Sequence, residues 1–164
     1  MEMLVALGMI GVLAMVSLPM LTKASDQARA QACRANLETI GKRLAAEVEQ
    51  HGCLPGLTTA ATTPDATDPL IELMRYDSPH VLVCPSDEKA GDPGHTSYRW
   101  FDAWSGIDPG SVYGLVDLPL VVEKQSYHDP VNNQRTALML YGEPTRGHRF
   151  LTRWVDGDSL VARP

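Results

Sequence analysis

The stretch MLVALGMIGVLAMVSLPML, residues 3–21, contains no charged residue and decides how the rest of the chain is interpreted. As an α-helix this segment would extend about 28 Å, roughly the hydrocarbon thickness of a bilayer. A cleavable secretory signal would show a basic segment, a shorter apolar core and a small-residue cleavage site, and none of these is visible. Instead an acidic residue, Glu2, stands directly before the apolar run. We therefore expect residues 1–21 to form a transmembrane helix.

The helical pattern continues beyond the apolar run, over residues 22–51. This segment has one glycine, Gly41, no proline, and apolar residues spaced by three and four: Cys33, Leu37, Ile40, Leu44 and Val48. Such spacing predicts one apolar stripe on an otherwise polar helix. His51-Gly52 ends the pattern and Pro55 prevents its resumption. The sequence thus predicts a single helix of about 50 residues, apolar all round and then amphipathic, which Pro19 kinks or locally melts.

Residues 52–164 predict a β-rich head with long loops. A Thr/Ala/Pro-rich loop fills residues 54–69, and a short helix is expected over 70–76, capped by Asp68 with Pro69 at its first position. The expected strands are 80–84, 97–101, 118–123, 137–141, and a hairpin of 149–155 with 160–163. The predicted fold class is α+β: a small antiparallel sheet covered by the amphipathic half of the helix.

Composition and motifs exclude several classes of function. The net charge of −6 indicates no nucleic-acid partner. There is no Gly-x-Ser-x-Gly and no phosphate-binding glycine loop, so we expect no enzyme activity. Three tryptophans are best interpreted as core or subunit-contact residues: Trp100, Trp104 and Trp154.

The three cysteines leave two pairings open. Cys33 and Cys53 would lie about 30 Å apart on a straight helix and cannot bridge each other. We prefer Cys53–Cys84, which would tie the helix end to the sheet, with Cys33–Cys84 as the alternative. A zinc site made of His51, Cys53, His80 and Cys84 is disfavoured, because these spacings are not standard for zinc ligands.

Several short motifs in this chain occur together in a known family. Pro19 lies seventeen residues after Glu2, and the family's remaining motifs are matched by Cys33, Asn36-Leu37, Ile40-Gly41, Leu54-Pro55, Cys84-Pro85-Ser86-Asp87, and His148 with Asp156-Gly157. In these features the chain resembles type IV pilins and type II secretion pseudopilins, particularly pseudopilin-like proteins with a C-terminal His and Asp-Gly motif. The gap after His148 is shorter than the family's usual one, so no role is assigned to that histidine.

The resemblance implies a pilin-like fold and a structural subunit of a pilus-like filament or secretion pseudopilus. Glu2 would neutralise the N-terminal amine of a neighbouring subunit, while Gly8, Gly11 and Pro19 would permit close helix packing and extension. The implied partners are sister subunits, the inner membrane, a prepilin peptidase acting on a leader upstream of Met1, and assembly platform proteins. The head would lie in the periplasm before assembly into a periplasmic or extracellular filament.

Two further possibilities complete the expectations. No cofactor is expected; Asp156 and Asp158 would bind calcium if they act as acidic residues do in some major pseudopilins, although Asp-Gly-Asp-Ser is also typical of a tight turn. The alternative function is a singly anchored periplasmic ligand-binding or sensor domain that does not polymerise.

Overall fold

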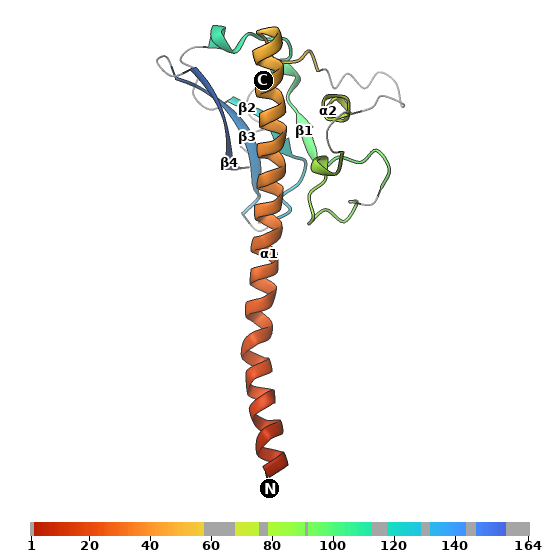
Figure 1. The fold of residues 1–164 in the computed structure, drawn as a ribbon, viewed down its shortest axis with the longest axis vertical. Coiled ribbons are helices and arrows are strands. Elements are labelled where there is room, and N and C mark those ends of the chain that lie inside the picture. Colours follow the sequence, from red (N-terminus) through yellow and green to blue (C-terminus); the bar gives the residue numbers. More distant parts are fainter. Residues whose placement is uncertain are drawn as a thin grey trace.

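A long helix carrying a small head at its C-terminal half makes up the molecule in the computed structural model (Figure 1). The structure describes residues 2–57, 68–75, 79–90, 92–112, 118–128, 132–143 and 147–156. Within these ranges the side chains at 2, 4–8, 10, 12, 14, 16, 19, 142–143 and 147–148 lie outside the description. The elements in chain order are α1 (Glu2–His51), α2 (Pro69–Leu73), η1 (Pro79–Leu82), β1 (Tyr98–Trp100), η2 (Asp102–Trp104), η3 (Pro109–Val112), β2 (Leu118–Glu123), β3 (Gln134–Glu143) and β4 (Gly147–Asp156).

The N-terminal helix α1 is continuous over its 50 residues, as the sequence predicts. The backbone stays helical through Pro19, so the expected local melting there does not occur. A proline removes only one backbone donor, and the remaining hydrogen bonds of the neighbouring turns preserve the helix. The predicted end is confirmed: Gly52 adopts a φ of +73° and its N–H donates to the carbonyl of Val48 at 2.8 Å.

The head contains a four-stranded antiparallel sheet in the order β1-β2-β3-β4. The strand predicted over 118–123 is confirmed, and those predicted over 97–101 and 137–141 correspond to β1 and the middle of β3. The longest ladder joins β3 to β4, from Gln134 opposite Asp156 to Glu143 opposite Gly147. The α+β class is therefore confirmed, with one long helix and one antiparallel sheet.

Two strand predictions need correction or lie outside the description. The segment 80–84 is not a strand, because Pro79–Leu82 forms a 3₁₀ helix that lies against α1. Pro79 and Pro85 flank this short apolar segment and limit its access to a strand ladder. The strand over 149–155 exists as part of β4, but it pairs with β3, and its predicted partner 160–163 lies outside the described residues.

One face of the second half of α1 forms the core with the sheet (Figure 1). The predicted stripe is confirmed, since four of its members are 0% exposed: Cys33, Leu37, Ile40 and Leu44. Gly41 allows this close approach: a β-carbon there would lie 3.0 Å from Leu138 Cδ1 and 3.3 Å from Phe150 Cβ. Fully burying each large apolar side chain contributes about 1.5–3 kcal/mol, so this stripe fixes the helix to the head.

The short helix α2 begins as the sequence predicts. Asp68 caps it, because its Oδ1 accepts a hydrogen bond from the Leu70 N–H at 3.0 Å. The other oxygen accepts from the Thr96 hydroxyl at 2.6 Å and from Lys124 Nζ at 3.2 Å. The helix ends earlier than expected, at Leu73. Asp68 thus joins α2 to two loops of the head.

Candidate assembly helix and buried cluster of the head

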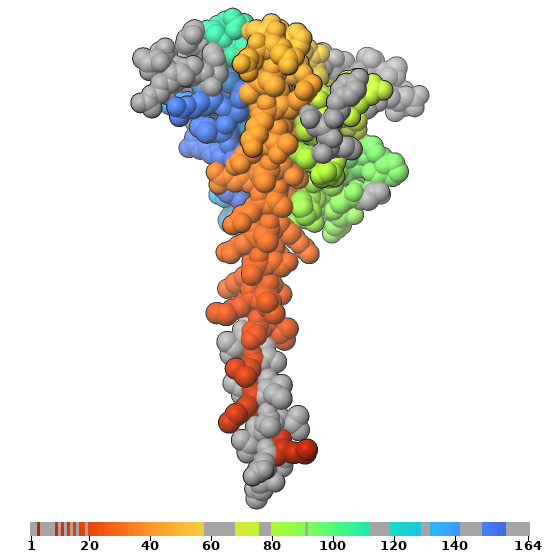
Figure 2. Space-filling view, viewed as in Figure 1, coloured from red at the N-terminus to blue at the C-terminus, as the bar shows by residue number. Residues whose placement is uncertain are grey.

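The first half of α1 projects from the head, and no other element of the described residues covers it (Figures 1 and 2). Its described large apolar side chains are 64–84% exposed: Met3, Met9, Leu13, Met15, Leu18, Met20 and Leu21. We call residues 3–21 the apolar stalk. Keeping each such side chain in water forgoes about 1.5–3 kcal/mol of burial, so the stalk requires an apolar environment from outside the chain.

The residues predicted to act in assembly lie on this stalk or beside it. The side chains of Glu2 and Pro19, and position 8, fall outside the description, whereas Gly11 is exposed with no atom within 4 Å of its β-carbon position. Among the residues whose side chains are described, no helical segment is both apolar enough and long enough to cross a bilayer. The transmembrane helix expected over 1–21 includes many side chains outside that description and stays a prediction.

The described side chains of α1 change from exposed to buried between the stalk and the head. Residues 22–29 are all exposed, and the first buried position among the described side chains of the helix is Cys33. The buried and partly buried apolar residues that α1 contributes to the core run from Cys33 to Val48. Three exposed charged residues of α1 lie between the stalk and the buried part of the helix: Lys23, Asp26 and Arg29.

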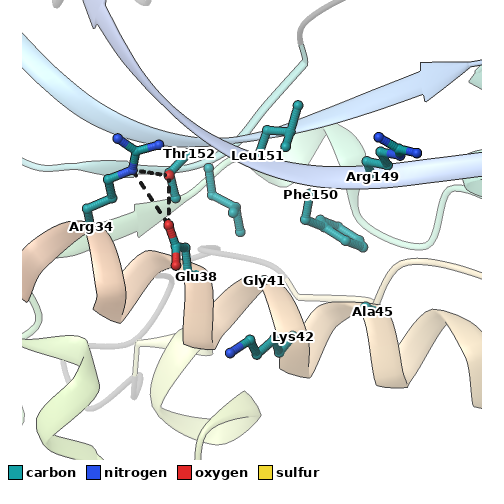
Figure 3. A pocket seen from close by; sticks show the side chains of 10 residues that line it. Arg34, Glu38, Gly41, Lys42, Ala45, Arg149, Phe150, Leu151 and Thr152 are labelled. Carbon is teal, nitrogen blue, oxygen red and sulfur yellow. Dashed lines mark hydrogen bonds and ion pairs between the residues drawn. The ribbon is translucent and has the colours of Figure 1, made fainter.

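An open groove of about 530 Å³ lies between α1 and β4 (Figure 3). At one end Arg34 Nε donates to the Thr152 hydroxyl at 2.8 Å and lies 3.6 Å from a carboxylate oxygen of Glu38. Two more cationic side chains, Lys42 and Arg149, line the groove. The groove therefore has three cationic side chains and one carboxylate, Glu38, around a lining that includes the apolar side chains of Leu138 and Phe150.

The disulfide joins Cys33 to Cys84, so the preferred pairing of Cys53 with Cys84 is wrong and the alternative is confirmed. The reason is tertiary: Cys33 lies on the buried stripe of α1, and the segment after η1 packs against that stripe with the two Cα atoms 5.2 Å apart. Cys53 lies beyond the helix end, is partly exposed and keeps a free thiol. The disfavoured zinc set is not assembled either, because Cys84 is in the disulfide and His51 Nδ1 lies 3.1 Å from Glu47.

A buried Glu–His pair lies against this disulfide. Glu123 is 0% exposed, and its Oε1 lies 3.6 Å from His128 Nε2, which is itself 3.3 Å from Cys84 Sγ. Burial raises the pKa of Glu123 to about 7, although the Thr136 N–H donates to the carboxylate. Burial lowers the pKa of His128, against the opposing effect of the Asp26 charge. The His128 ring and the Glu123 carboxylate thus lie in an interior where a charge is costly.

The Asp of the Cys-Pro-Ser-Asp motif organises a second buried polar network. Asp87 Oδ2 accepts from the Ser97 hydroxyl at 2.6 Å and the Tyr127 hydroxyl at 2.7 Å, and lies 2.7 Å from His95 Nε2. Its Oδ1 accepts from the Lys89 N–H at 3.0 Å. Burial alone would raise the pKa of Asp87, but these hydrogen bonds outweigh it and hold that pKa well below its usual range.

Sequence reasoning missed Glu123, His128 and the network of Asp87. One signal was present: the segment 118–123 is an almost continuous apolar run, which is typical of a strand buried on both faces. A glutamate at the end of such a strand is a candidate for burial. Nothing local to the sequence indicates that His128 folds back onto it.

Of the two predicted calcium ligands, only Asp156 lies within the described residues. Asp156 ends β4 opposite Gln134, whereas Asp158 and the side chain of His148 lie outside the described residues. The calcium site at Asp156 and Asp158 therefore stays a prediction. Comparison of the chain with protein-family models, curated protein sequences and solved structures finds no match.

Proposed function

We propose that the chain is a structural subunit of a type IV pilus-like filament or type II secretion pseudopilus. It would be stored in the inner membrane and polymerised through α1, and it would have no catalytic role. The observation that carries this proposal is the apolar stalk, whose described apolar side chains are exposed and whose helix continues without a break into the helix that packs on the head. The long helix on a four-stranded antiparallel sheet is compatible with a pilin-like layout.

The stalk suits both the stored and the assembled state. Lipid and a bundle of sister stalks are similarly apolar, so close packing of small residues and pairing of polar groups would decide between them. Glu2 would supply such a polar group by neutralising a cationic N-terminus of the neighbouring subunit. A prepilin peptidase and assembly platform proteins are the further partners under this proposal, and the heads would coat the filament.

The second candidate is a singly anchored periplasmic ligand-binding or sensor domain. The groove between α1 and β4 favours it, because three cations, Arg34, Lys42 and Arg149, outnumber the one carboxylate, Glu38, around an open volume of about 530 Å³. An anionic ligand with an apolar part would suit that lining. Under this candidate Glu2 would be dispensable and the protein would never polymerise.

Replacement of Glu2 separates the two candidates. We expect Glu2→Ala to leave the protein in the membrane fraction but to abolish filaments seen by electron microscopy of the producing cells. Glu49→Ala is the matched control, because Glu49 is an exposed carboxylate on the head half of the same helix. Normal filaments with Glu2→Ala would refute the assigned role of Glu2, and absence of filaments from wild-type cells would favour the anchored domain.

A further inference from the structure

Four metal-binding side chains meet in the interior of the head, independently of the stalk. Cys33 comes from α1, Cys84 from the segment after η1, Glu123 from the end of β2 and His128 from the loop that follows. One donor atom from each lies within 4.8 Å of all the others. The two cysteines and the glutamate are fully buried, and the His128 side chain is 6% exposed. Sulfur, nitrogen and carboxylate oxygen are the donors that zinc takes in proteins.

The glutamate has one oxygen occupied and one open toward the cluster. Oε2 accepts a hydrogen bond from the Thr136 N–H at 2.8 Å, which fixes the carboxylate. Oε1 is buried and accepts no hydrogen bond from the described part of the chain, and His128 Nε2 of the cluster lies 3.6 Å away. A buried carboxylate oxygen without a donor is costly, and a cation at this point would remove that cost. Outer hydrogen bonds of the kind made by Thr136 are typical of metal-ligating carboxylates.

Two distances between the donors match the edges of a zinc tetrahedron. Zinc–sulfur distances of about 2.3 Å and zinc–nitrogen or zinc–oxygen distances of about 2.0–2.1 Å place neighbouring ligands roughly 3.3–3.8 Å apart. His128 Nε2 already lies 3.3 Å from Cys84 Sγ and 3.6 Å from Glu123 Oε1. The disulfide bond itself does not fit, because its two sulfur atoms must separate before both can bind a metal.

We propose that reduction of the Cys33–Cys84 disulfide converts this cluster into a Cys2HisGlu site for zinc or a similar thiophilic divalent cation. A dithiol reductant supplies two electrons and two protons: the Cys33–Cys84 bond breaks, two cysteine thiols form, and the dithiol becomes a disulfide. The cation then displaces the two thiol protons and binds both thiolates, His128 Nε2 and Glu123 Oε1. A disulfide oxidant reverses the sequence, restores the Cys33–Cys84 bond, is reduced to a dithiol and releases the cation. The head would thus be cross-linked by a disulfide when the cysteines are oxidised and by a metal ion when they are reduced.

Cobalt and zinc binding by the full chain tests the proposal. The protein is purified in detergent micelles, stripped of metal, reduced with a phosphine without oxygen, and titrated with Co²⁺. We expect one Co²⁺ per chain, with the strong visible bands of tetrahedral cobalt and thiolate charge-transfer bands in the near ultraviolet, and displacement by Zn²⁺. The oxidised protein should show neither set of bands. Circular dichroism of each sample reports whether the head is folded.

Single replacements assign the ligands. Glu123→Gln and His128→Gln, which keep the size of a polar side chain, should each weaken Zn²⁺ binding by at least about 100-fold, since loss of even outer-shell partners costs 10–100-fold. Cys53→Ser should bind as the wild type does, because Cys53 lies outside the cluster. The proposal is overturned if reduced wild type gives no tetrahedral cobalt spectrum, if Cys33→Ser/Cys84→Ser gives the same spectrum, or if neither Gln variant changes the affinity. A reduced head that stays unfolded with excess Zn²⁺ would overturn it as well.

Discussion

Removal of the Cys33–Cys84 disulfide is the sharpest test of how the head is attached to α1. The bond links residues separated by 51 positions and is buried within the stripe that joins helix to sheet. The Cys33→Ala/Cys84→Ala variant keeps small apolar side chains at both positions, so it removes the covalent link without adding a polar group. We expect the fold to survive with reduced stability, because the remaining stripe still packs on the sheet.

The expected magnitude follows from the closed loop. The chain-entropy relation for a loop of this length gives about 14 cal/mol/K, or roughly 4 kcal/mol at 25 °C, as the free energy of unfolding lost with the link. The dependence of that free energy on urea should also steepen, since an unlinked unfolded chain exposes more surface. With a chelator present no metal can replace the disulfide, and reduction of the wild type should cost a similar amount.

Urea unfolding in detergent micelles measures this loss. Trp100 is 1% exposed in the core, so tryptophan fluorescence reports the unfolding of the head. Cys53→Ser is the control and should unfold as the wild type does, because Cys53 is not in the disulfide. The reasoning would be refuted by a double variant that loses less than about 1 kcal/mol, or by an equal loss in Cys53→Ser.

Three further substitutions test the packing and polar networks of the head. Asp87→Asn should lower the free energy of unfolding by about 1.5–3 kcal/mol at neutral pH, since hydrogen bonds to a buried charge are lost. The pKa of Asp87 in the folded protein lies below the unfolded value of about 3.9, so its stabilisation is present above that pH and is lost as the pH falls further. The variant should therefore be less acid-sensitive than the wild type in the same urea assay. Gly41→Val should cost about 1–3 kcal/mol, because the added atoms overlap Leu138, and a lowered thermal midpoint would show it. Asp68→Ala should cost about 1 kcal/mol through loss of the cap on the Leu70 N–H, measured by urea unfolding.

Each of these three substitutions has a result that would contradict its interpretation, and Asp87→Asn also has a control variant. Glu88→Gln removes an exposed carboxylate next to Asp87 and should change stability and acid sensitivity little. Equal effects of the two carboxylate changes would contradict the role given to the network. A Gly41→Val protein as stable as the wild type would show that the helix can move away from the sheet without cost, and an unchanged Asp68→Ala protein would show that water replaces the cap.

Several elements of the fold follow from patterns within a few residues. The spacing of Cys33, Leu37, Ile40 and Leu44 fixed the buried face of α1, and Gly52 marked its end, because these depend only on the geometry of one helix. The strand over 118–123 was equally readable from its composition. The segment 80–84 was not, since four apolar residues between prolines are compatible with either a strand or a helical turn.

By itself the sequence determined that the chain has a long helix with an apolar first half and an α+β head, because side-chain periodicity and hydropathy act along the chain. Only the tertiary structure decided which cysteine pairs with Cys84, and that Glu123 and His128 lie against that pair. These contacts join residues far apart in the chain, 51 positions in the case of the disulfide, and depend on how helix, 3₁₀ turn and strand pack together. The same packing leaves Oε1 of Glu123 with no hydrogen-bond donor among the residues that the structure describes, which no local pattern could have indicated.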